Sequence, residues 1–141
     1  MILLFGLAVS FVNFGIHAVM TALIVVTARH TKSRTHHLGI FVRLPALLTV
    51  TVTILMLAHI AEIAAWAAAL DAFDIKISTV NAFEFSFENY TALGYGDGLP
   101  VNAEYRLIGP VMALNGLLLI GWSVAVIFEV MRMAEFEFHR R

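Results

Sequence analysis

The sequence predicts an all-α integral membrane protein with three spanning helices and one shorter re-entrant segment. Hydrophobic residues make up 60% of the 141 residues and charged residues only 13%, roughly half of what a soluble domain carries. A helix needs roughly 20 apolar residues to cross the hydrocarbon core. Three stretches meet this requirement, at residues 2–28, 44–70 and 107–130. These observations indicate one membrane domain with almost no soluble part.

The charge balance and the cysteine count exclude several classes of function. The formal net charge is -1, which gives no basic surface for a nucleic-acid partner. The chain has no cysteine, so disulfides, thiolate metal sites and thiol chemistry are excluded. The partners that remain are membrane lipid, small ions and further copies of the chain.

Residues 1–28 form the first predicted spanning helix. The stretch carries no formal charge, and His17 is its one titratable side chain. It lacks a basic start and a small-residue cleavage site and is too long for a signal peptide, so we expect it to stay as a helix. A basic loop over 29–43 follows, and then a second helix over 44–70 that contains His59 and Glu62.

The distribution of charge predicts the orientation in the membrane. Lysine and arginine favour the cytoplasmic side. They gather between the first and second helices and after the third, at Arg29, Lys32, Arg34, Arg43, Arg132, Arg140 and Arg141. Acidic residues occupy the link between the second and third helices, at Asp71, Asp74, Glu84, Glu88 and Asp97. We therefore expect the N-terminus outside, the C-terminus in the cytoplasm, and a bacterial inner (plasma) membrane location.

Residues 79–90 are predicted to form a short helix rich in aromatic side chains, with Ser78 or Thr79 as its N-cap. A helix of this length cannot cross the bilayer. The following residues 91–97 contain two glycines, Gly94 and Gly96, and do not read as a helix. Non-helical backbone at membrane depth survives only when it is buried in protein or lines a water-filled path. The segment is therefore predicted to enter and leave on one side, before a third helix over 103–133 and a short tail over 134–141.

The stretch after this short helix resembles the selectivity filter of potassium channels. It reads Tyr90-Thr91-Ala92-Leu93-Gly94-Tyr95-Gly96-Asp97. The similarity to the potassium-channel pore domain covers residues 44 to about 130, as a helix, a pore loop and a second helix. The chain thus resembles the small prokaryotic channels of this family, with one extra transmembrane helix at the N-terminus.

This resemblance implies a homotetramer that conducts K⁺ passively, without an enzymatic reaction and without a cofactor other than the permeant ion. Backbone carbonyls replace the water around K⁺ in such a filter. For successive carbonyls to face one axis, the backbone must alternate with left-handed angles, which glycine adopts at little cost. The ion-binding segment it implies is Thr91, Ala92, Leu93, Gly94, Tyr95 and Gly96.

The resemblance also implies roles for residues around the filter. Glu88 and Asp97 match carboxyl groups behind and outside the filter, and Arg106 matches a basic residue at the start of the inner helix. Gly116 falls on the glycine at which inner helices bend, as a gating hinge. Asn115 either lines the cavity or hydrogen-bonds a neighbouring helix.

One departure from the family pattern bears on selectivity. The position before the hydrophobic-Gly-Tyr-Gly run is usually threonine, whose hydroxyl helps to form the innermost ion site, and here it is Ala92. Losing that hydroxyl weakens the innermost site. A weakly selective pore for monovalent cations is therefore the first alternative.

His59 and Glu62 lie three residues apart on the second helix and so share a face. Three roles stay open for them: hydrogen bonding to the back of the pore helix, a pH-sensing pair, and ligation of a metal. A haem- or metal-binding membrane protein that uses His17 and His59 is the alternative from another class. A further alternative is a structural subunit that contributes one filter strand to a mixed assembly.

Overall fold

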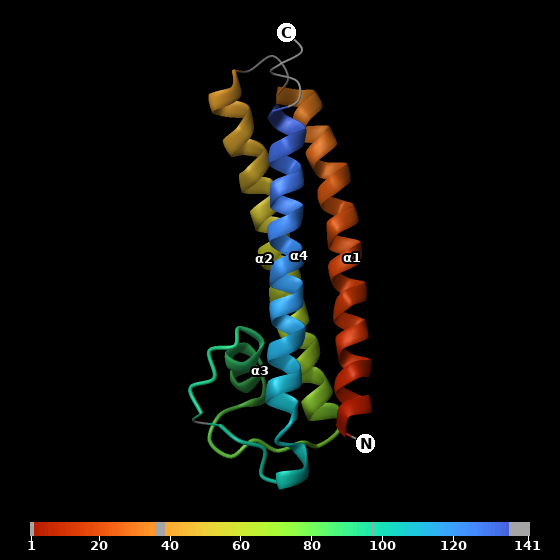
Figure 1. Cartoon of the computed structure of the whole chain (residues 1–141), viewed down its shortest axis with the longest axis vertical. Coiled ribbons are helices and arrows are strands. Elements are labelled where there is room, and N and C mark those ends of the chain that lie inside the picture. The colour runs from red at the N-terminus through yellow and green to blue at the C-terminus, as the bar shows by residue number, and fades with distance from the viewer. Residues whose placement is uncertain (1, 36–38, 97, 136–141) are drawn as a thin grey trace.

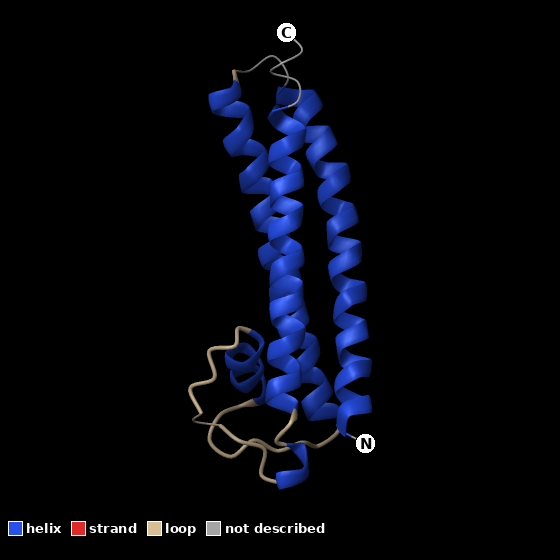
Figure 2. Cartoon of the chain, viewed as in Figure 1, coloured by secondary structure: helices blue, strands red, loops and turns tan. Residues whose placement is uncertain are grey.

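The computed structural model describes residues 2–35, 39–96 and 98–135. In chain order its elements are α1 (Ile2–Thr35), α2 (Ile40–Ala72), α3 (Ala82–Tyr90), the 3-10 turn η1 (Ala103–Tyr105) and α4 (Ile108–Glu135). The three long helices run side by side, and no strand occurs in the described ranges (Figure 2). Short α3 lies near one end of the bundle, beside α2 and α4 and on the side opposite α1 (Figure 1). The fold is all-α, as predicted.

Within the described residues, three helices are long and apolar enough to cross a membrane: residues 2–35, 40–72 and 103–134. The N-terminal end of α1 and the whole link from α2 to α4 lie at one end of the bundle (Figure 1). The C-terminal ends of α1 and α4 lie at the other end. The protein therefore spans the membrane three times, and α3 is a fourth, non-spanning helix inside the last link.

The first two helices extend further than predicted. The basic stretch 29–43 was expected to be a loop, but α1 continues to Thr35 and α2 begins at Ile40. The loop prediction was wrong because charge marks the edge of the membrane and not the end of a helix. Thirty-four residues at about 1.5 Å each give roughly 51 Å, well over the roughly 30 Å of hydrocarbon. The last turns of α1 are closed by Thr35 Oγ1, which donates to the Thr31 carbonyl at 2.7 Å.

The third spanning segment is interrupted near its start. A single helix was predicted over 103–133, but η1 ends at Tyr105 and α4 begins only at Ile108. Pro110 lies in the first turn of α4, where its missing N–H costs no helical hydrogen bond. Most of the predicted tail, residues 136–141, lies outside the described residues.

The core has an apolar part at each end and a polar layer near the middle of the long helices. At the α3 end, Trp66, Phe85 and Met112 are fully buried together. At the other end, Ile24 and Leu47 belong to a second buried cluster between the three long helices. The buried polar side chains between them include Asn13, His17, Glu62, Asn115 and Ser123. Because polar groups are costly inside a membrane protein, this layer needs internal partners.

Candidate functional site

The link between α2 and α4 enters and leaves the bundle at one point. An isolated antiparallel bridge joins Ile77 to Pro100. Around it, Ser78 N–H donates to the Leu99 carbonyl at 3.0 Å, and Leu99 N–H donates to Ser78 Oγ at 3.2 Å. The two flanks of α3 and the glycine segment are therefore tied together. This is the geometry of a re-entrant loop.

The helix inside this loop starts later than predicted. Neither Ser78 nor Thr79 is its N-cap. Asn81 caps α3, and its Oδ1 accepts from Glu84 N–H at 2.8 Å. The cap prediction was wrong because the Ser78 hydroxyl bonds across the loop to Leu99 instead. At the mouth of the loop and outside the spans, the hydrogen bond that Lys76 donates to the Asp74 carboxylate raises the pKa of the Lys76 amino group.

The C-terminal end of α3 closes in a Schellman motif. Leu93 N–H donates to the Glu88 carbonyl at 2.9 Å, and Ala92 N–H donates to the Asn89 carbonyl at 2.9 Å. These two bonds satisfy carbonyls that a helix end leaves open. The left-handed residue of the motif is Ala92, with φ 57°, where glycine is usual. A residue other than glycine at this φ is uncommon.

From Ala92 onward the sign of φ alternates from one residue to the next. Positive φ recurs at every second residue, at Ala92 (57°), Gly94 (52°) and Gly96 (80°). Leu93 and Tyr95 between them have no positive φ. Such alternation is the backbone pattern that the predicted filter requires, and glycine adopts the left-handed angles at little cost. In the predicted filter this pattern would give a row of peptide oxygens along one side of the chain.

The Thr91 hydroxyl does not join this row. Its Oγ1 donates to the Phe87 carbonyl at 2.9 Å and lies 3.2 Å from the Glu88 carbonyl oxygen. Since Ala92 has no hydroxyl, neither residue offers a side-chain oxygen beside the Ala92 carbonyl.

Gly116 of α4 lies directly against the end of α3. A Cβ added at Gly116 would overlap the backbone carbonyl of Tyr90 and lie 3.1 Å from its ring. The predicted role of Gly116 was a hinge. The structure gives it a packing role, because only a residue without a side chain allows the end of α3 to approach α4 so closely.

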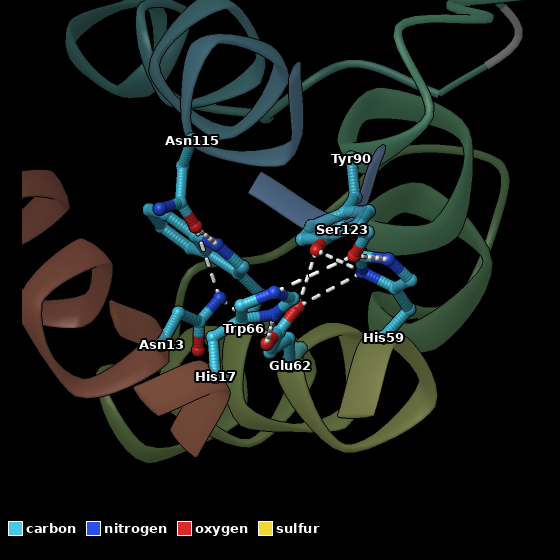
Figure 3. Close-up of polar contacts among 8 residues, drawn as sticks. All are labelled: Asn13, His17, His59, Glu62, Trp66, Tyr90, Asn115 and Ser123. Atoms are coloured by element: carbon cyan, nitrogen blue, oxygen red, sulfur yellow. Dashed lines mark hydrogen bonds and ion pairs between the residues drawn. The ribbon is translucent and has the colours of Figure 1, made fainter. Parts of the chain in front are cut away.

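Behind α3, five polar side chains form a closed set of contacts (Figure 3). The Tyr90 hydroxyl donates to Glu62 Oε2, and Glu62 Oε1 lies 2.8 Å from His17 Nδ1. His59 Nδ1 lies 2.8 Å from the Tyr90 hydroxyl, and His59 Nε2 lies 2.9 Å from Ser123 Oγ. Ser123 Oγ is 3.4 Å from His17 Nε2, which completes the circuit. We call these five residues the polar ring.

A second polar group adjoins the ring through Asn13, which lies one turn before His17. Asn13 Nδ2 donates to Asn115 Oδ1 at 3.0 Å and to the Glu62 backbone carbonyl at 3.3 Å. Trp66 Nε1 donates to the same Asn115 oxygen at 3.0 Å. The Asn115 oxygen is therefore directed at α1 and α2, as hydrogen bonding to neighbouring helices requires. These bonds do not support a cavity-lining role for this amide.

A comparison with family models adds evidence independent of this geometry. A model described as an ion channel matches residues 49–133, more than half of the 141 residues. The chain belongs to this ion channel family. The match covers most of α2, all of α3 and nearly all of α4. It agrees with the sequence resemblance, and the fold explains it, because these three helices and the re-entrant loop form the segment matched.

The channel is therefore a membrane protein that passes ions, and its first helix lies outside the matched segment. No curated protein and no solved structure gives a significant match. Members of ion channel families are in general not enzymes. The ion and the number of subunits are matters for the proposal below.

The other predicted site residues differ in how far they are exposed in the channel subunit. Glu88 is half-buried on α3 and bonds the turn through its backbone carbonyl. Arg106 is exposed between η1 and α4. Leu93 and Tyr95 are exposed, at 56% and 67%. Asp97 lies outside the described residues, so its expected place just outside the filter stays a prediction.

The predicted pair on α2 does come together. His59 Nδ1 lies 3.1 Å from Glu62 Oε2, and Glu62 also bonds the last residue of α3. Hydrogen bonding to the back of the re-entrant helix is therefore present. The pH-sensing role of the pair stays a prediction.

The haem alternative fits this geometry poorly. A haem between His17 and His59 needs a flat macrocycle between the two imidazoles, but their ring centres are 5.5 Å apart and the Glu62 carboxyl bonds both rings. A small metal ion is a different case, because donor atoms of His17, His59 and Glu62 lie within 4.8 Å of one another. Each of these donors already has a partner inside the polar ring.

The sequence pointed to His17, His59 and Glu62, but not to the other two members of the polar ring. Tyr90 was read as one of several aromatic residues of a short helix, and Ser123 was not singled out. The available signal was spacing: Asn13 and His17 lie one turn apart on an otherwise apolar helix, as do His59 and Glu62. Polar residues that share a helix face within a membrane span predict a partner on another helix.

Proposed function

We propose that the protein is a potassium channel in which four copies surround one axis. The peptide carbonyls of residues 92–96 from each copy take the place of the water around K⁺, and no cofactor takes part. Thr91 and Glu88 end the pore helix, α3, on which this filter rests. The permeant ion and the lipid are then the only ligands that the pore requires.

The alternation of φ from Ala92 to Gly96 is the observation that carries this proposal. One chain offers oxygens on one side only, so a closed shell around an ion needs symmetry-related copies. The positive φ is costly at Ala92, because the close approach of its Cβ to the backbone raises the conformational energy by roughly 1 kcal/mol. Backbone held in such a region is typical of functional sites.

The surface around the filter supports assembly. Phe83 and Phe87 of α3 are 44% and 42% exposed, and Leu93 and Tyr95 of the filter are more exposed still. Along α4, Leu114, Leu117 and Leu118 are also more than half exposed. Apolar side chains beside a row of bare carbonyls suit a contact with another copy, since lipid cannot satisfy those carbonyls.

The orientation follows the charge argument. The filter and the N-terminus lie at one end of the bundle, and the basic residues of α1 lie at the other (Figure 1). The positive-inside tendency then puts Arg29 and Arg34 in the cytoplasm and the filter toward the outside of a bacterial plasma membrane.

A weakly selective cation pore is the second candidate, and one observation favours it. The innermost site lacks a hydroxyl from Ala92, and the Thr91 hydroxyl is turned back toward Phe87 and Glu88. Fewer oxygens hold the ion there, which lowers the number of ligands that discriminate K⁺ from Na⁺.

Planar-bilayer recordings of the purified protein test the proposal. With K⁺ on one side and Na⁺ on the other, the proposed channel reverses close to the K⁺ equilibrium potential. A reversal potential near zero assigns the weakly selective pore instead. Native mass spectrometry of the protein expressed alone gives a tetramer if one chain is sufficient, and a monomer or dimer favours the mixed assembly.

A further inference from the structure

The polar ring draws one side chain from α1, two from α2, and one each from α3 and α4. His17 is on α1, His59 and Glu62 are on α2, Tyr90 ends α3, and Ser123 is on α4. His17 and Glu62 are fully buried, and Tyr90 is 1% exposed. All four helices are therefore tied at one level by side chains that are buried, except for His59, which is 16% exposed.

One assignment of protons satisfies all members of the ring without a net charge. If Glu62 is protonated and both histidines are neutral, the five side chains bring five hydrogen-bonding protons to these five links, and His59 Nδ1 also lies 3.1 Å from Glu62 Oε2. With Tyr90 donating to Glu62, the remaining acid proton joins Glu62 to His17, and His17 Nε2–H points at Ser123. Ser123 then donates to His59 Nε2, and His59 Nδ1–H donates to Tyr90. A neutral, closed network suits the membrane interior, where an unpaired polar group costs several kcal/mol.

The polar ring lies next to the filter because one of its members, Tyr90, is also the last residue of α3. Tyr90 is the last residue of α3, its carbonyl lies against Gly116, and Ala92 begins the alternating backbone two residues later. Fixing the Tyr90 side chain therefore fixes the point at which the filter leaves α3. Glu62 holds Tyr90 from one side, and His17 holds Glu62 from the other.

We infer that His17, on the helix that the family match leaves out, is a positioning residue for the filter. It orients Glu62, and Glu62 in turn holds Tyr90 at the end of α3. The first helix is then a working part of the ion pathway rather than a membrane anchor. This inference rests on the proposed filter function for its effect on selectivity.

Asn13 supports the same arrangement from the same helix face. It bonds the Glu62 backbone carbonyl and Asn115 Oδ1, so α1 is fixed to α2 and α4 one turn away from His17. The position of His17 relative to Glu62 is therefore determined by two contacts of α1 and not by one.

Variants at His17 test the inference in reconstituted channels. His17→Leu keeps the buried volume but leaves Glu62 without a partner on α1. His17→Asn returns an amide near the position of Nδ1, within reach of Glu62. Val19→Leu is the matched control, because Val19 lies on the same helix and is 68% exposed. We expect His17→Leu to lower the K⁺/Na⁺ permeability ratio about five- to tenfold, with partial recovery in His17→Asn and no change in the control.

The double variant tests the route through Glu62. Tyr90→Phe removes the hydroxyl group that donates a hydrogen bond to Glu62. If His17 acts through Glu62 and Tyr90, the double variant His17→Leu/Tyr90→Phe is no worse than Tyr90→Phe alone. Effects that multiply in full would overturn the route.

Hydrogen exchange gives a readout that needs no current. In His17→Leu the amides of residues 91–94 should exchange at least about tenfold faster, while those of α4 after Ser123 stay protected. Uniform loss of protection would mean a general folding role and overturn the inference. So would unchanged exchange at 91–94, or a stoichiometric transition metal in the purified protein, since the ring residues would then be its ligands. A wild type without K⁺ selectivity defeats the proposed function instead, and the exchange result still decides the role of His17.

Discussion

Gly116 of α4 and the carbonyl of Tyr90 lie so close together that a single added methyl group would overlap the carbonyl oxygen. This contact joins the inner helix to the end of the pore helix, one residue before the turn that leads into the filter. Gly121, further along the same helix, has no atom within 4 Å of the position that a Cβ would take. Substitutions at these two glycines therefore distinguish a packing requirement from the general effect of replacing glycine in a helix.

Gly116→Ala should push the end of α3 away from α4. Overpacking of this kind costs about 1–3 kcal/mol. We expect a lower thermal midpoint for the assembly and a reduced K⁺ current. Gly121→Ala is the matched control, and it should raise stability by up to about 1 kcal/mol because alanine favours the helix. Equal effects of the two substitutions on stability and current would contradict the packing role.

Gly94 tests the alternating backbone. At φ 52° a Cβ costs about 1–2 kcal/mol in each chain, and a β-branched side chain costs more. Single-channel currents should therefore fall in the order wild type, Gly94→Ala, Gly94→Val. Gly15→Ala on α1, where nothing lies within 4 Å, should conduct as the wild type does. Full currents in both Gly94 variants would remove this residue from the filter.

Ala92 tests the missing oxygen of the innermost site. Ala92→Ser adds a hydroxyl without a β-branch, so we expect it to raise the K⁺/Na⁺ permeability ratio. Ala92→Thr adds the same hydroxyl, but its β-branch is strained at φ 57° and should lower the amount of assembled channel. Ala92→Gly is the control for strain alone, since it relieves the backbone without adding an oxygen. A ratio that is the same in all three variants would refute the account of this position.

Asn115 distinguishes hydrogen bonding between helices from a place in the cavity. Asn115→Leu keeps the number and branching of the side-chain heavy atoms but leaves Trp66 Nε1 without an acceptor and Asn13 Nδ2 with only the longer bond to Glu62. Bonds between membrane helices average about 0.6 kcal/mol, so the two together predict a loss of about 1–2 kcal/mol in stability. Unitary conductance should stay the same. A changed conductance at unchanged stability would support the cavity role.

The general architecture could be read from the sequence because it depends on the length of apolar runs and on two glycines. The predicted spans at 2–28 and 44–70 fall within α1 and α2, the span at 107–130 falls within α4 except for its first residue, and the short helix before the filter ends at Tyr90. The ends of α1 and α2 were missed because no physical rule stops a helix where the membrane stops. The cap of α3 was missed because Ser78 has a competing partner, Leu99, that is 21 residues away.

The contacts between helices in the polar ring could not be derived from the sequence, because its five residues come from four helices. The sequence does not identify a hydrogen-bond partner for His17, because the rotation of α1 about its own axis depends on packing. Once Asn13 and His17 face α2, Glu62 becomes their common neighbour. The first helix is thus the part of the channel for which the structure adds most to the sequence.

A density map of the detergent-solubilised assembly in K⁺ tests the central claim most directly. The account predicts four copies around one axis, with the carbonyls of residues 92–96 facing it and ion density on the axis between them. A map in which these residues lie on the outer surface of the assembly, away from any symmetry axis, would contradict it.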